Sequence, residues 1–169
     1  MRLDVSKILA LSLVLAACGA SAPRPSTPEA PATKAQAGGL RIKHTAIYVD
    51  DQEKALRFYT EVLGFVKKAD FSQGSYRWLT VASPEEPDGT ELQLALNADP
   101  AARAYQQAMF QQNQPAAMFF TDDVQAEYER MKARGAEFTL TPTDVTASTI
   151  AILDDTCGNR IQLTQLRRG

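Results

Sequence analysis

The order of apolar and polar positions first indicates a strand and then a helix. Residues 41–49 are rich in β-branched and aromatic side chains, which predicts a strand. Apolar residues then recur at helical spacing, which predicts a helix with one buried face. Asp50 or Asp51 can cap this helix, Asp50 with Glu53 has the form of a capping box, and Gly64 is its predicted end. The buried face consists of Ala55, Phe58, Tyr59, Val62 and Leu63.

Three more strands and a connecting helix follow. The strands are predicted at 65–71, 76–81 and 90–96, because turn-forming residues separate these apolar segments. Asp99 followed by Pro100 is typical of a helix cap and a first-turn proline. We therefore expect a connector helix over residues 99–111.

The same order of elements then occurs a second time. A strand is predicted at 116–121, a helix capped by Asp122 or Asp123 ends at Gly135, and three strands follow at 136–141, 148–153 and 159–166. Aligning IYVDDQEKALRFYTEVLG with MFFTDDVQAEYERMKARG places the paired aspartates in register. This internal repeat predicts an α+β domain over residues 40–166, built of two βαβββ modules at 40–97 and 116–166.

The N-terminal residues follow a different pattern. Arg2 and Lys7 precede an apolar run from Ile8 to Ala17, which is too short to span a bilayer and has the length of a signal-peptide core. The string LAAC ending at Cys18 resembles the lipobox of bacterial lipoproteins. The resemblance implies a signal peptide at 1–17, a lipid on Cys18 and a location in the bacterial cell envelope, lipid-anchored on its periplasmic or extracytoplasmic side. A plain secreted protein is the alternative.

Composition indicates a linker and argues against some functions. Residues 18–39 are rich in alanine and proline and contain no aromatic side chain, which predicts a flexible linker. The net charge of −2 gives no indication of a nucleic-acid partner. Cys157 is the only cysteine besides Cys18, and two neighbouring aspartates argue against a nucleophilic role for it.

Two motifs in the modules resemble a known superfamily. FYTEVLGF ends the first helix, and LDDTCGNRIQLTQL closes the second module. Together with the repeat, they are similar to the vicinal oxygen chelate superfamily, which includes glyoxalase I, methylmalonyl-CoA epimerase, extradiol dioxygenases and bleomycin-binding proteins. The resemblance covers roughly residues 40–166. It implies an open, curved sheet around a cup, with metal ligands on the inner face of the sheet.

The ligand positions that the resemblance implies are only partly filled. His44 matches the family's histidine, and Gln93 stands where relatives have Glu or Gln. Ala116 stands where a second histidine is common, and Gln162 where Glu is usual. Because alanine supplies no lone pair and glutamine only a neutral oxygen, His44, Gln93 and Gln162 would hold zinc, nickel, cobalt or manganese weakly.

Strand alternation also suggests residues that contact a ligand. Leu92, Leu94 and Leu96 are predicted to face the helix, so the residues between them face the cup. The resulting inner face is expected to be polar and able to bind a small molecule. Its candidate ligand-binding residues are His44, Glu91, Gln93, Arg160 and Gln162.

Three functions remain open at this point. The first is a lipid-anchored domain that binds a small molecule in its cup, with a degenerate metal site. The second is a divalent-metal lyase or isomerase of the glyoxalase or epimerase type. The third is an envelope interaction module. No catalytic residue is assigned, and the modules can pair within one chain or across a homodimer.

Overall fold

The computed structural model describes residues 39–167, and the described residues from Leu40 onward form one compact unit. The predicted signal peptide, Cys18 and all of the predicted linker except Gly39 lie outside the described residues. Within the described part of the chain, no helix is long and apolar enough to cross a membrane.

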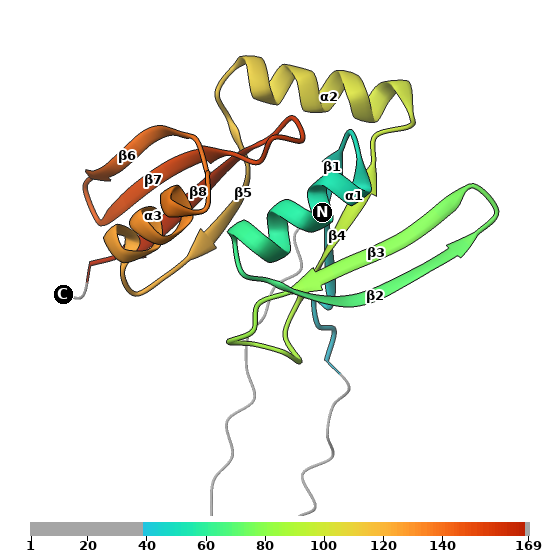
Figure 1. Cartoon of the computed structure of the whole chain (residues 1–169), viewed down its shortest axis with the longest axis horizontal. Coiled ribbons are helices and arrows are strands. Elements are labelled where there is room, and N and C mark those ends of the chain that lie inside the picture. Colours follow the sequence, from blue (N-terminus) through green and yellow to red (C-terminus); the bar gives the residue numbers. More distant parts are fainter. Residues whose placement is uncertain (1–38, 168–169) are drawn as a thin grey trace, which may run out of the picture. The chain divides into compact units, whose positions relative to one another are not determined.

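Two similar groups of elements follow one another, as the repeat predicted (Figure 1). We call them module 1 and module 2, and α2 connects them. Module 1 consists of β1 (His44–Val49), α1 (Gln52–Arg57), the π-helical turn η1 (Phe58–Val62), β2 (Val66–Gln73), β3 (Tyr76–Ala82) and β4 (Glu91–Leu96). The connector is α2 (Pro100–Gln111). Module 2 consists of β5 (Pro115–Phe120), α3 (Val124–Ala133), β6 (Phe138–Asp144), β7 (Ser148–Asp154) and β8 (Arg160–Leu166).

Each module forms its own four-stranded mixed sheet. The strand orders are β1-β4-β3-β2 and β5-β8-β7-β6. In both sheets the first strand runs parallel to the last strand of its module, and the remaining pairs are antiparallel. The predicted α+β class with two βαβββ modules is confirmed. The sheets do not close into a barrel.

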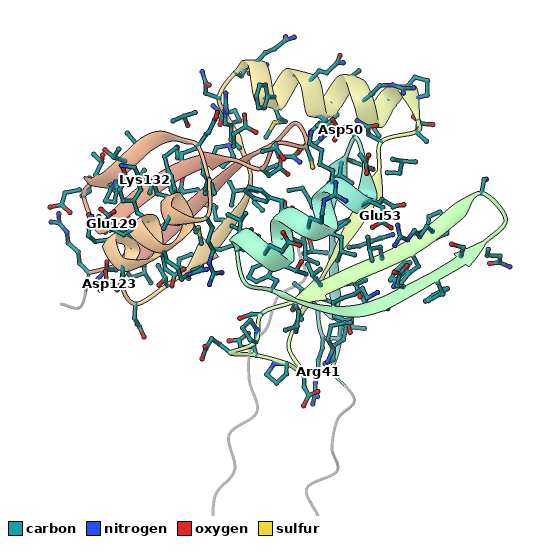
Figure 2. All side chains as sticks on the ribbon, in the orientation of Figure 1. Arg41, Asp50, Glu53, Asp123, Glu129 and Lys132 are labelled. Atoms are coloured by element: carbon teal, nitrogen blue, oxygen red, sulfur yellow. The ribbon has the colours of Figure 1, made fainter. Side chains whose placement is uncertain are left out.

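The helix starts follow the aspartates, with one correction. Asp51, not Asp50, caps α1 by accepting hydrogen bonds from the backbone N–H groups of Glu53 and Lys54. The predicted capping box is wrong, because the Glu53 carboxylate instead pairs with Arg77 of β3 at 2.6 Å. Figure 2 shows Glu53 between α1 and the β2–β3 hairpin, and Asp123 at the start of α3. Asp99 and Asp123 cap α2 and α3 as expected.

One hydrophobic core serves both modules. It includes helix-facing residues of the first sheet, such as Val49 and Leu94, and helix-facing residues of the second, such as Leu153 and Ile161. Phe65 of module 1 meets Phe119 of module 2 edge to face, with ring centroids 5.0 Å apart. Figure 1 shows α1 lying between the two sheets. Because the helix-facing sides share this core, the opposite faces of both sheets point away from it.

Candidate functional site

The candidate site lies on the face of the first sheet opposite α1, which we call the inner face of module 1. Strand pairing is what gathers its residues. In the parallel β1–β4 pair, His44 lies beside Glu91 and Ala46 beside Gln93, and Gln93 in turn lies beside Thr80 of β3. Because paired residues project to the same side of a sheet, these side chains form one continuous surface.

His44 and Glu91 are direct neighbours on this face. Their Nε2 and Oε2 atoms are 3.5 Å apart, and the side chains are 45% and 25% exposed. Glu91 Oε2 also accepts a hydrogen bond from the Thr80 hydroxyl at 2.6 Å. Because Thr80 is fully buried, its hydroxyl has a fixed position and holds the Glu91 carboxylate in place. The arrangement leaves a partly exposed imidazole beside an anchored carboxylate.

Aromatic side chains continue the surface away from His44. The His44 ring meets Trp78 edge to face at 5.3 Å, and Trp78 stacks on Phe71 at 6.3 Å with an interplanar angle of 19°. Phe71 is 61% exposed. Gln93 donates from Nε2 to the hydroxyl of Tyr76 at 2.7 Å, which leaves its carbonyl oxygen without a hydrogen bond from any described residue. The inner face of module 1 therefore combines polar groups with a flat apolar platform.

The structure places Gln162 on the corresponding face of module 2. Its amide nitrogen contacts the Thr164 hydroxyl at 3.0 Å and the Met118 sulfur at 3.5 Å. This face is less polar than predicted, because Met118, Phe120 and Leu166 are each more than half exposed on the same side. Among the described residues, no hydrogen bond, ion pair or ring contact joins Gln162 to His44, Glu91 or Gln93.

Arg160, the remaining candidate ligand-binding residue, has partners within the chain. Its Nη1 binds Asp154 at 2.7 Å, and its guanidinium lies 4.0 Å from the ring centroid of Phe110 in α2. Only 14% of the Arg160 side chain is exposed. Its Nε atom is buried and has no hydrogen-bond partner among the described residues. These contacts hold Arg160 against the connector helix.

The donor set of a single chain does not fit a divalent metal. His44 and Gln93 lie on one sheet and Gln162 on the other, and Ala116 contributes no donor atom. His44 Nε2 lies 3.5 Å from Glu91 Oε2, so a carboxylate already occupies the space beside this nitrogen. Across residues 39–167, no three His, Cys, Asp or Glu side chains are grouped as a metal site would require.

Cys157 belongs to a buried turn rather than to a reactive site. Burial raises the pKa of its thiol to about 12, and the nearby Asp155 carboxylate contributes. The direction agrees with the sequence argument, but burial is the larger cause. A thiol in this environment stays protonated and is a poor nucleophile.

A cavity between the modules was not predicted from the sequence. It has a volume of about 820 Å³ and lies where the segments after η1 and after β3 meet α3 and the ends of β5 and β8. Phe65, Phe119 and Met131 contribute apolar surface, and Arg130 and Arg134 contribute charge. Arg130 donates to the carbonyls of Val62 and Leu63 and pairs with Glu127, so its guanidinium is already occupied.

The fold agrees with comparisons to known proteins. The model of the Glyoxalase/Bleomycin resistance protein/Dioxygenase superfamily matches residues 41–163, and the chain belongs to that superfamily.

Three relatives illustrate the range of similarity. The Bacillus subtilis (strain 168) protein YurT is 51% identical over 126 residues, which are 75% of this chain and 99% of YurT. A lactoylglutathione lyase from Neisseria meningitidis serogroup A is 28% identical over 138 residues, covering 77% of this chain and 94% of the lyase. The crystal structure of TnmS3, an antibiotic binding protein from Streptomyces sp. CB03234, has a TM-score of 0.62 and 29% identity, covering 77% of this chain and 98% of TnmS3.

Proposed function

We propose that this protein binds a small molecule on the inner face of module 1 without needing a metal. The observation that carries the proposal is the partly exposed surface of His44, Glu91 and Gln93 beside Trp78 and Phe71. Small-molecule sites combine apolar and aromatic area with a few well-placed polar groups, and this surface has both. The likeness to an antibiotic binding protein supports a binding role.

A second copy of the chain would complete this site as a cup. The inner faces of the two modules point away from their shared core, and Met118, Phe120 and Leu166 leave apolar area exposed on module 2. In a homodimer, the inner face of module 2 from one copy would cover the inner face of module 1 from the other. Gln162 of one copy would then lie opposite His44 of the other. Sedimentation of the wild type and of Phe120→Glu tests this arrangement. We expect the wild type to sediment as a dimer, and the glutamate charge of Phe120→Glu to weaken the dimer.

The second candidate function is a divalent-metal lyase or isomerase. The similarity to lactoylglutathione lyase favours it. When bound, such a metal supplies Lewis-acid stabilisation of a developing negative charge. His44 and Gln93 of one copy and Gln162 of another would have to hold it, and two of these three are neutral amides. Metal analysis of the purified protein separates the two functions, because stoichiometric metal that disappears in His44→Ala would contradict the metal-free proposal.

A thermal-shift screen of metabolites and antibiotics tests the binding function. We expect at least one compound to raise the melting temperature of the wild type, and Gln93→Ala to reduce that shift. Gln125→Ala is the matched control, because Gln125 is an exposed glutamine on α3 whose side chain contacts only Glu129. A screen without any hit would contradict the proposal and favour the third function, an envelope interaction module.

We further propose that a lipid on Cys18 anchors the protein in the bacterial cell envelope. Support comes from the short apolar run before the LAAC string and from the linker after it. Metabolic labelling with a fatty-acid analogue should mark the wild type and not Cys18→Ser. If Cys18→Ser is labelled and membrane-bound like the wild type, the anchor proposal is wrong.

A further inference from the structure

The side chains around His44 form a directional hydrogen-bond chain. The backbone N–H of Ala69 donates to Thr80 Oγ1 at 3.1 Å, and the Thr80 hydroxyl donates to Glu91 Oε2 at 2.6 Å. A hydroxyl has only one proton, so the Ala69 contact uses an acceptor position of Thr80 and leaves its proton for Glu91. Glu91 Oε2 therefore faces His44 as an acceptor.

The carboxylate at the end of this chain favours one position for the proton of a neutral His44. At 3.5 Å from a carboxylate oxygen, an unprotonated Nε2 would direct its lone pair at a negative charge, whereas Nε2–H is attracted to it. The partner of one ring nitrogen sets the tautomer of a neutral imidazole, and the other nitrogen is then an acceptor. With the proton on Nε2, the acceptor of His44 would be Nδ1.

We infer that Glu91, anchored by Thr80, is a positioning residue that holds His44 as the Nε2–H tautomer, so that Nδ1 accepts a hydrogen bond from a ligand hydroxyl. The inference rests on the proposed function and specifies its ligand class. The platform of Trp78 and Phe71 beside the imidazole suits a planar aromatic ring. A phenol combines such a ring with a hydroxyl donor, and it is the ligand class to which this surface is complementary.

The sequence makes a direct test practical, because His44 is the only histidine in the 169 residues. Two-bond ¹H–¹⁵N spectra of the labelled protein report which ring nitrogen is protonated, at a pH where the spectrum itself shows a neutral ring. We expect protonation at Nε2 and a larger ¹⁵N separation than in a histidine peptide under the same conditions. Protonation at Nδ1 would overturn the inference, and so would a ¹⁵N separation equal to that of the peptide. Neither result needs a variant.

Variants identify the residue responsible. Glu91→Gln should reduce the ¹⁵N separation to the peptide value, and Thr80→Val should reduce it in part, because the carboxylate loses its anchor. Glu91→Asp keeps the charge and should retain Nε2 protonation. If a folded Glu91→Gln protein kept the wild-type ¹⁵N separation, the tautomer would have another cause and the proposed role of Glu91 would be wrong.

The ligand class has a separate test with phenol and anisole as probes. Anisole has the same ring but no hydroxyl proton. Trp78 is the only tryptophan, so its emission reports binding at this face. We expect phenol to bind up to about tenfold more tightly than anisole, and the difference to disappear in His44→Ala. Equal affinities, or no phenol binding, would overturn the ligand class. A hit from the wider screen alongside that result would leave the binding function standing.

Discussion

The phenolic hydroxyl of Tyr59 donates to Asp155 Oδ2 at 3.2 Å and joins the helical segment of module 1 to a turn of module 2. Both side chains are fully buried. Asp155 also accepts hydrogen bonds from the backbone N–H groups of Cys157 and Asn159 and from the Asn159 side chain. Burial raises the pKa of Asp155, and these donors oppose that shift. The contact therefore contributes to holding the two modules together.

Removing the Tyr59 hydroxyl should weaken this connection. Tyr59→Phe keeps the ring packed and deletes one buried hydrogen bond, so we expect the free energy of unfolding to fall by about 1 kcal/mol. Urea unfolding measures it. Tyr105→Phe is the control, because Tyr105 is an exposed side chain on α2. Equal stabilities of Tyr59→Phe and the wild type would contradict the assigned contact.

Gly158 should tolerate alanine less well than Gly74. Both have positive φ, +93° and +62°, so alanine costs about 1–2 kcal/mol at either position. A Cβ on Gly158 would also lie 3.0 Å from Gln106 Nε2, which donates to Tyr48 and Cys157, whereas Gly74 has open space. Gly158→Ala should therefore show the larger fall in melting temperature. The reverse order would contradict the packing of α2 against this turn.

Arg130 should contribute more to stability than Arg134. Arg130 of α3 donates to two carbonyls at the end of η1, those of Val62 and Leu63, while Arg134 donates to Glu61 alone. Hydrogen bonds from a charged donor are worth about 1.5–3 kcal/mol. Arg130→Ala should lower the free energy of unfolding by about 2 kcal/mol, and exposed Arg134→Ala by less. Similar losses in both variants would argue against the Arg130 contacts.

Asp70 should make the stability of the folded protein depend on pH in the acid range. Hydrogen bonds from Arg77 lower the pKa of Asp70 to about 2, from 3.8. A carboxyl whose pKa is lowered by folding stabilises the folded state above its unfolded pKa and loses this contribution as the pH falls through the folded value.

The matching measurement compares melting temperatures of the wild type and Asp70→Asn. We expect the wild type to be more stable at pH 6, and the difference to shrink between about pH 4 and pH 2. The effect should be small because the pair is near the surface. Asp88→Asn, in the loop between β3 and β4, is the control. A difference that grows as the pH falls would have the wrong sign.

Local patterns in the sequence were enough to predict the elements and the faces of the strands. The change from strand-like to helical spacing predicted every α-helix and strand but not the π-helical turn η1, and period-two alternation placed Glu91 and Gln93 on one face of β4. The choice between Asp50 and Asp51 as the helix cap depends on the backbone conformation where the helix starts, which the pattern does not determine. The capping-box pattern favoured Asp50, whereas Asp51 is the cap.

Contacts between distant segments could not be predicted in the same way. The position of Arg160 depends on how Phe110 of α2 packs, and nothing in either segment indicates that pairing. Alternation along β4 suggested Glu91 as a residue that faces the cup, but only the register of β1 against β4 places it beside His44. Thr80 was missed, although alternation from Tyr76 and Trp78 would have indicated its face.

The most direct test of metal-free binding on the inner face of module 1 is a fluorescence titration of Trp78 with a hit from the screen. It is performed on the wild type before and after treatment with a chelator, and on His44→Ala. We predict saturable quenching with the same dissociation constant before and after chelation, and affinity weakened about tenfold by His44→Ala. Binding that disappears with the chelator and returns with zinc would contradict metal-free binding at this face. An affinity that is unchanged in His44→Ala would contradict it as well.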